Sequence, residues 1–326
     1  MSNRRQFTTL LGGAATWPLA ARAQQPGLPD IGFLHVASPG AFPHLLAGFR
    51  EGLKDTGVIE GQNARIEFRW AEGRYDRLPA LAAELVRQRV SVLVAVGGED
   101  SALAAKAATT SIPIVFLVAR DPALTGLVAS LNRPGGNATG VNLYGAELGA
   151  KRLGLLHDLI PTASVIGLLL NPSYLTADAE VREVEAAARR IGCEILLLKA
   201  SSDREIDAAF AAMRTRIRAL LVGTDPFFNS RRGHIVALAA QEAVPAMFDQ
   251  REFAAAGGLI SYGTSLADAY RQVGVYAGRI LRGEKPSELP VLQPTKFDLV
   301  INLKTATALG LTIPPTLLST ADEVIE

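Results

Sequence analysis

Toward the end of its first third the chain reads Val90-Ser91-Val92-Leu93-Val94-Ala95-Val96-Gly97-Gly98-Glu99-Asp100-Ser101. The apolar run predicts a strand that is buried on both faces, as strands of parallel sheets are. The two glycines that follow are a typical strand exit, and the polar residues after them fit the loop that leads into a helix. One strand followed by one helix is the repeating unit of an α/β fold, so the same order is expected on both sides of this stretch.

Outward from this stretch the alternation continues in two series. The first begins with the apolar run 30–37 and ends with the apolar run 114–118. Helical spacing of apolar residues and short apolar runs then alternate again further along the chain. We therefore predict two α/β units laid end to end. The second unit is predicted to contain helices near 147–158, 178–191, 203–216 and 230–242 and strands near 164–170, 194–199, 218–223 and 245–248.

Turn-rich segments mark where the two units meet. Asn132-Arg-Pro-Gly-Gly-Asn-Ala-Thr-Gly140 cannot belong to a helix or a central strand, and further breaks come at 256–258 and 283–286. Three breaks predict three chain crossings between two lobes, without a long linker. The boundaries expected from the sequence are residues 28–140 with 260–286 for the first lobe, and 141–259 with 287–326 for the second.

The first 23 residues have the pattern of an export signal. Two arginines, Arg4 and Arg5, precede a short apolar stretch, Thr9–Ala20, which ends at Ala21-Arg22-Ala23. About a dozen apolar residues are too few for a membrane span, which needs roughly 20. We therefore predict a cleaved signal peptide, with cleavage after Ala23, of a kind similar to twin-arginine signals, and a periplasmic protein that is not membrane-anchored.

This assignment predicts a mature N-terminus at Gln24. Replacing both Arg4 and Arg5 with lysine should stop export, because a twin-arginine signal needs the arginine pair. N-terminal mass spectrometry of the periplasmic protein checks the cleavage site, and Met1 retained there would contradict it. Export of the lysine variant would contradict the twin-arginine route alone.

Charge and cysteine content exclude several classes of protein. Loss of Arg4, Arg5 and Arg22 with the signal leaves 30 basic against 32 acidic residues, and no basic run remains. A nucleic-acid-binding surface is therefore not expected. Cys193 is the single cysteine, so neither an internal disulfide nor a multi-cysteine metal cluster is possible.

Catalytic motifs are also missing from the sequence. It contains no G-x-S-x-G, no H-E-x-x-H and no G-x-x-x-x-G-K-[ST] pattern. The four histidines are scattered, without the close spacing of metal ligands. We therefore expect a protein that is not an enzyme and has neither a cofactor nor a metal. The histidines are His35, His44, His157 and His234.

Polar loops follow several predicted strands, where ligands bind in open α/β sheets. They occur in both units, so a cleft between two lobes would be lined from both sides. Asp121 and Asp225 each precede a proline in such a loop. They could neutralise a bound ammonium group, cap a helix, or act as paired catalytic carboxylates, in that order of preference. The loops are 38–40, 97–101, 120–122, 171–174 and 224–229.

Five segments carry a resemblance to a known family: 121–140, 257–263, 293–297, 301–306 and 309–314. They resemble the ABC-transporter substrate-binding family of the type I periplasmic binding protein fold. The branch that includes tryptophan-binding lipoproteins is particularly similar, although no lipobox cysteine follows the signal here. The resemblance implies two doubly wound α/β lobes joined by a three-strand hinge, and a small molecule trapped between them for an ABC permease and its ATPase.

For an amino-acid-like ligand, the resemblance and the strand exits together suggest a set of contacts. The carboxylate would meet N–H groups around Gly98 and the Ser101 hydroxyl, and the ammonium would meet Asp121 or Asp225. Aromatic residues would contact the ligand side chain, although core packing is an equal possibility for Phe227. The candidate ligand-binding residues are Ser38, Phe42, Gly97, Gly98, Ser101, Asp121, Asn171, Tyr174, Asp225, Phe227 and Tyr262.

Two other functions stay open at this point. A ligand sensor that docks on a signalling receptor would use the same two lobes as a transport protein. A periplasmic hydrolase is disfavoured because no nucleophile motif is present. The ligand could be an aromatic or branched amino acid, a small aromatic acid or a peptide-like compound.

Overall fold

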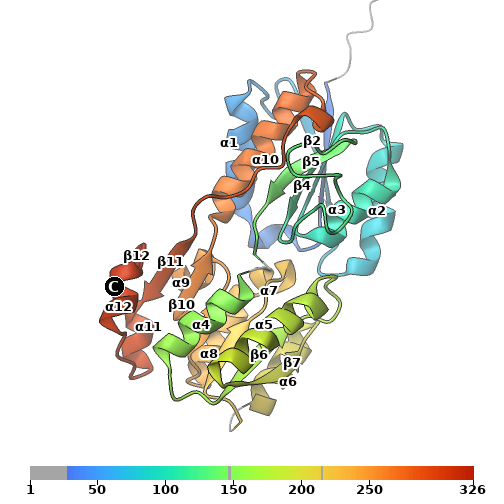
Figure 1. Cartoon of the computed structure of the whole chain (residues 1–326). Coiled ribbons are helices and arrows are strands. Elements are labelled where there is room, and N and C mark those ends of the chain that lie inside the picture. The colour runs from blue at the N-terminus through green and yellow to red at the C-terminus, as the bar shows by residue number, and fades with distance from the viewer. Residues whose placement is uncertain (1–27, 146–147, 214–215) are drawn as a thin grey trace, which may run out of the picture.

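The computed structural model describes residues 28–145, 148–213 and 216–326, which form two lobes joined by three chain crossings (Figure 1). The predicted signal peptide lies outside the described residues. Each lobe is a sheet with helices packed on both faces, so the predicted α/β fold is confirmed. Within the described ranges, no helix is long and apolar enough to span a membrane.

The first lobe is built on a parallel sheet with the strand order β2-β1-β3-β4-β5. In β3 (Val92–Val96) the three valines face a core shared with α1 and α10, whereas Leu93 and Ala95 face α2 and α3. Figure 1 shows these two helix pairs on opposite faces. The remaining elements are β1 Asp30–His35, β2 Arg65–Trp70, β4 Ile114–Val118, β5 Ala138–Asn142, α1 Pro43–Asp55, α2 Leu78–Arg87, α3 Glu99–Ala108, α10 Leu266–Leu281, and the short 3-10 helices η1 Pro39–Ala41, η2 Tyr75–Arg77 and η3 Pro286–Glu288.

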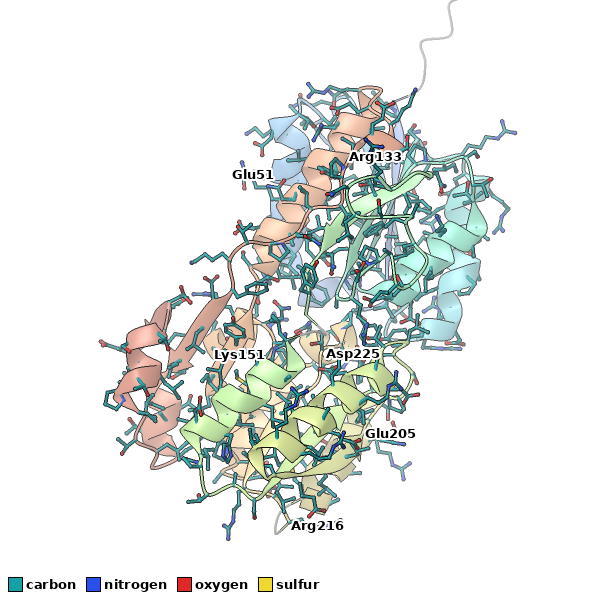
Figure 2. All side chains as sticks on the ribbon, in the orientation of Figure 1. Glu51, Arg133, Lys151, Glu205, Arg216 and Asp225 are labelled. Atoms are coloured by element: carbon teal, nitrogen blue, oxygen red, sulfur yellow. The ribbon has the colours of Figure 1, made fainter. Side chains whose placement is uncertain are left out.

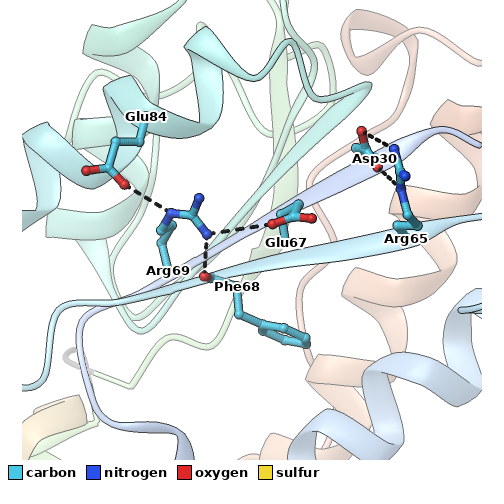
Figure 3. Close-up of polar contacts among 6 residues, drawn as sticks. All are labelled: Asp30, Arg65, Glu67, Phe68, Arg69 and Glu84. Atoms are coloured by element: carbon cyan, nitrogen blue, oxygen red, sulfur yellow. Dashed lines mark hydrogen bonds and ion pairs between the residues drawn. The ribbon is translucent and has the colours of Figure 1, made fainter. Parts of the chain in front are cut away.

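Charged side chains line the edge strand β2 of this lobe (Figure 3). Arg65 donates to both carboxylate oxygens of Asp30 on β1, at 2.7 and 3.1 Å. Arg69 donates to Glu84 on α2 at 3.1 Å and lies 3.8 Å from Glu67. Exposed ion pairs of this kind add little stability. Charges on an edge strand do discourage pairing with other chains.

The second lobe has a seven-stranded sheet with the order β12-β11-β10-β9-β8-β6-β7. Its strands are parallel except for the β10–β11 pair, which is antiparallel. The strands are β6 Val165–Leu170, β7 Glu194–Lys199, β8 Ala219–Val222, β9 Ala246–Phe248, β10 Ile260–Gly263, β11 Asp298–Asn302 and β12 Glu323–Ile325. The helices are α4 Gly149–Leu159, α5 Ala177–Ile191, α6 Asp203–Met213, α7 Pro226–Ser230, α8 Arg232–Gln241, α9 Arg251–Ala255, α11 Leu303–Ala308 and α12 Pro315–Thr320.

The crossings lie a few residues after the expected boundaries. Residues 260–263 were assigned to the first lobe, but they form β10, which pairs with β9 and β11 of the second lobe. Residues 287–292 were assigned to the second lobe, but Leu289 is buried in the first-lobe core and Leu292 bridges to Val141. The sequence boundary followed the turn residues, whereas the chain changes lobes only after the next strand or bridge is complete.

Candidate ligand-binding cleft

A small cavity of about 50 Å³ lies between the two lobes. Several wall residues lie at or just beyond the carboxyl ends of strands, including His35 at the end of β1, Gly97 after β3 and Asp249 after β9. The first lobe and the crossing at Leu143 contribute His35, Phe42, Gly97, Gly98, Leu117, Val118, Ala119, Leu143, Leu266 and Tyr270. The second lobe contributes Tyr174, Thr224, Pro226, Asn229, Asp249 and Gln250.

A fixed histidine–tyrosine pair forms part of the first-lobe wall. The Ala37 N–H donates to Nδ1 of His35 at 2.9 Å, and Nε2 lies 2.9 Å from the Tyr270 hydroxyl. Burial lowers the pKa of His35 to about 3, so the ring is neutral at physiological pH. Because Nδ1 accepts a hydrogen bond, Nε2 carries the hydrogen and donates to Tyr270. The hydroxyl hydrogen of Tyr270 is thereby left for another acceptor.

Two glycines at the exit of β3 bring this wall close to its neighbours. Gly97 has φ +84°, and a Cβ there would lie 2.7 Å from the His35 ring. Gly98 has φ +97°, and a Cβ there would lie 2.8 Å from the Tyr174 hydroxyl of the opposite lobe. A side chain at either position would be strained and would also push the walls of the cavity apart.

Helix α3 begins immediately behind Gly98, without a side chain capping its N-terminus. Its first N–H groups and its positive dipole end therefore favour a negatively charged group nearby. The buried Ser101 hydroxyl, in the same turn, has no hydrogen-bond partner among the described residues. Glu99 is occupied in a different way, because its Oε1 accepts the N–H groups of Ala119 and Arg120 at 2.8 and 2.7 Å.

Arg152 is a buried cation behind the second-lobe wall, where it contacts the cavity residue Thr224. It is 1% exposed, and it donates to the Tyr262 carbonyl and to the Thr224 hydroxyl, both at 2.9 Å. Two buried acids lie within its electrostatic reach. Burial raises the pKa of Glu180 to about 8 and that of Asp249 to about 6, and the positive charge of Arg152 opposes both shifts. Of these two acids, Asp249 lines the cavity.

Several hydrogen bonds cross from one lobe to the other. The Tyr75 hydroxyl donates to Asp225 Oδ1 at 2.7 Å, and the Tyr174 hydroxyl donates to Glu99 Oε2 at 2.5 Å. The label in Figure 2 places Asp225 on the side of its lobe that faces the first lobe. Further contacts across the seam join Leu175 to Asp100 at 3.3 Å and Arg120 to Glu183 at 3.0 Å. These contacts exist only when the lobes are closed on each other.

Of the eleven residues that the sequence suggested, four line the cavity: Phe42, Gly97, Gly98 and Tyr174. Asn171, Ser101 and Asp225 are buried but do not line it, and Ser38 precedes η1.

The other suggested residues have structural contacts. Asp121 does not line the cavity, and its Oδ1 accepts the Ala123 N–H at 2.8 Å, which is a turn contact. Asp225 is the N-cap of α7, where it accepts the Phe227 N–H at 2.5 Å. Phe227 is packed in the core of the second lobe, and Tyr262 stacks on Phe297.

The sequence reasoning missed the residues with the most distinctive chemistry. Asp249 follows the predicted strand 245–248 directly, so the strand-exit rule applied to the other loops would have found it. His35 is the last residue of β1 and was hidden by the apolar run that precedes it. Arg152 stands four residues before Leu156 on the buried face of α4, which is a weak signal because a long side chain can also bend outward to solvent.

Comparison with known proteins agrees with this geometry. The profile of the family described as ABC transporter substrate binding protein matches residues 31–325. A tyrosine-binding protein of Clostridioides difficile (strain R20291) is 27% identical over 282 residues, covering 86% of this chain and 81% of that protein.

Two solved structures are also similar, and each match covers 91% of this chain and 99% of the other. An ABC domain from Streptococcus pneumonia in complex with L-Trp is 26% identical with a TM-score of 0.81. A ligand-free, open substrate-binding protein from Clostridium difficile is 25% identical with a TM-score of 0.60.

Proposed function

The chain belongs to the ABC transporter substrate-binding protein family, and on that basis we propose that it is the exported, periplasmic solute-binding component of an ABC importer. It captures an amino-acid-like or aromatic ligand between its lobes and delivers it to the permease and its ATPase. The observation that carries this proposal is the cavity closed from both sides by strand-exit residues. A ligand that contacts both lobes shifts the open and closed populations toward the closed form.

The lining of the cavity favours a ligand with an apolar body and a zwitterionic end. Phe42, Leu117 and Leu143 offer apolar surface, which suits an aromatic or branched side chain. The N-terminus of α3 and the Ser101 hydroxyl suit a carboxylate. Asp249 suits an ammonium group, and we propose it for the role that the sequence analysis gave to Asp121 or Asp225. The relatives that bind tyrosine and L-Trp support an amino-acid ligand.

A ligand screen tests the proposed class directly. Thermal-shift and calorimetric titration of the mature protein should show binding of L-tryptophan, L-tyrosine or a branched amino acid. Indole-3-propionate, which lacks the ammonium group, should bind more weakly than L-tryptophan because Asp249 would lose its partner. Stronger binding of indole-3-propionate than of every amino acid would contradict an amino-acid ligand while leaving the binding cleft in place.

Binding should also change the shape and the stability of the protein. At a hundredfold excess over Kd, a ligand that binds only the folded form adds about 2.7 kcal/mol to the free energy of unfolding. Small-angle scattering at pH 7.5 should show a smaller radius of gyration, because the closed form is stabilised by contacts from both lobes. An unchanged radius at saturation would mean that the ligand binds within one lobe.

A further inference from the structure

Two tyrosine–carboxylate pairs cross the seam in opposite directions. Tyr75 of the first lobe donates to Asp225 of the second, and Tyr174 of the second donates to Glu99 of the first. The two tyrosine rings are 6.0 Å apart, so the pairs are neighbours. Burial raises the pKa of both tyrosines well above the ordinary value, so both hydroxyls stay protonated and can donate to the carboxyl groups.

The two carboxyl groups differ in how completely they are satisfied. Glu99 accepts two backbone N–H groups and the Tyr174 hydroxyl. Asp225 accepts Tyr75 and the Phe227 N–H on Oδ1, whereas its buried Oδ2 receives no well-directed hydrogen bond from the described residues. A buried carboxylate whose oxygens are incompletely hydrogen-bonded is costly, and adding a proton to it removes the charge.

The surroundings of Asp225 also favour the protonated form. Burial in the closed seam raises its pKa to about 7, although Tyr75, the Phe227 N–H and Asn171 oppose the shift. Asp100 on α3 raises it further, and Glu180 on α5 is another acid that interacts with it. The arginines on adjoining elements are engaged with other acids: Arg74 with Asp76, Arg77 with Glu72, Arg231 with Asp203 and Arg120 with Glu183.

We propose that the Tyr75–Asp225 and Tyr174–Glu99 pairs are a latch that holds the lobes closed, and that closing it places one proton on Asp225. The inference rests on the proposed function in that closure accompanies ligand capture. Tyr75 does not line the cavity, so it is a positioning residue that supports affinity through closure. Opening exposes Asp225 to water and releases the proton, so the latch weakens as pH rises.

The direction of the pH effect follows from the two states of Asp225. In the open form the carboxyl has an ordinary pKa of about 4, and in the closed form its pKa is about 7. The closed form therefore binds more protons between these values, and closure is lost progressively as pH rises from about 4 to about 7. Above about pH 7, Asp225 is charged in both forms, and closure no longer changes with pH through this residue.

Two variants separate the latch from general stability. Tyr75→Phe should weaken binding of L-tryptophan or L-tyrosine about tenfold, because the hydrogen bond to Asp225 exists only in the closed form. Tyr276→Phe is the matched control, because its hydroxyl donates to the Pro290 carbonyl within the first lobe at 2.7 Å. The control should lower the melting temperature and leave affinity unchanged. Equal affinities of the two variants would overturn the latch.

The variant Asp225→Asn tests whether closure of the lobes places a proton on Asp225. Asparagine can still cap α7 and accept the Tyr75 hydroxyl, but it carries no charge at any pH. The ratio of the wild-type Kd to the variant Kd should rise at least tenfold between pH 5 and pH 7.5. Asp249 is present in both proteins, so its own titration cancels in this ratio. A ratio that does not change with pH would overturn the assignment of the proton to Asp225. A Kd that still rises with pH in Asp225→Asn, but not in Asp100→Asn, would also overturn it.

Scattering without ligand keeps this test separate from the ligand proposal. The wild type should have a larger radius of gyration at pH 7.5 than at pH 5, and Asp225→Asn should stay compact at both. Equal wild-type radii at the two pH values would overturn proton-linked closure. Failure of L-tryptophan and L-tyrosine to bind would count against the amino-acid ligand and would not affect this measurement.

Discussion

Arg152→Met is expected to lower the free energy of unfolding by about 3–5 kcal/mol, the cost of removing one partner from a buried group of charges. Methionine fills a similar volume, so the loss reports charge and hydrogen bonding more than packing. The substitution leaves Glu180 and Asp249 without their cation, and it removes the hydrogen bonds to Thr224 and Tyr262. Urea unfolding at pH 8, followed by circular dichroism, measures the change.

The loss should be smaller at pH 5 than at pH 8. Glu180 and Asp249 have raised pKa values in the folded protein, about 8 and about 6. Both can therefore be protonated at pH 5, where the missing cation matters less, and both carry charge as pH rises through these values. Arg251→Met is the matched control, because Arg251 forms an exposed pair with Glu323 and its loss should cost less than about 1 kcal/mol. Equal losses for the two variants would contradict a central role of Arg152.

Asp249→Asn is expected to weaken binding of an amino acid by about 2–5 kcal/mol, which is more than tenfold. The reason is that the ligand ammonium loses its charged partner, Asp249, which is buried in the wall of the cavity. The fold should be retained, because asparagine has the same shape and Glu180 still lies beside Arg152. Calorimetric titration with L-tryptophan and L-tyrosine, together with the melting temperature, gives both quantities.

The control for this substitution is Asp121→Asn. Asp121 accepts the Ala123 N–H in a turn, which asparagine can also do, so affinity should stay within twofold. A tenfold loss in Asp121→Asn with none in Asp249→Asn would restore the assignment made from the sequence. Indole-3-propionate sharpens the comparison, because Asp249→Asn should not weaken its binding.

The sequence predicted the fold well because the signals for buried strands are local. The apolar runs 90–96 and 114–118 became β3 and β4, and the helices predicted near 178–191 and 203–216 became α5 and α6. The lobe boundaries were less accurate. A turn-rich segment shows where the chain can bend, but pairing with distant strands determines which sheet residues 260–263 join.

Residues of the cleft were predicted only where their position along a strand was informative. Phe42, Gly97, Gly98 and Tyr174 stand near strand ends, and they do line the cavity. For Asp121 and Asp225 the same position gave carboxylates that accept backbone N–H groups in turns. An aspartate before a proline can bind a ligand or accept backbone N–H groups in a turn, so spacing alone could not separate these two roles. The contacts of Arg152, Tyr75 and Tyr270 join residues more than 70 positions apart, which no local pattern reveals.

The return of the chain to the first lobe has a consequence for how this protein is made. Helix α10 comes after most of the second lobe in the sequence, yet it covers one face of the first-lobe sheet together with α1. A growing chain that has not yet reached residue 266 therefore exposes the apolar side of that sheet. The second lobe likewise waits for β11 and β12 at the end of the chain. Neither lobe can be completed during synthesis before the last segments appear, and until then the nascent polypeptide depends on protection from aggregation.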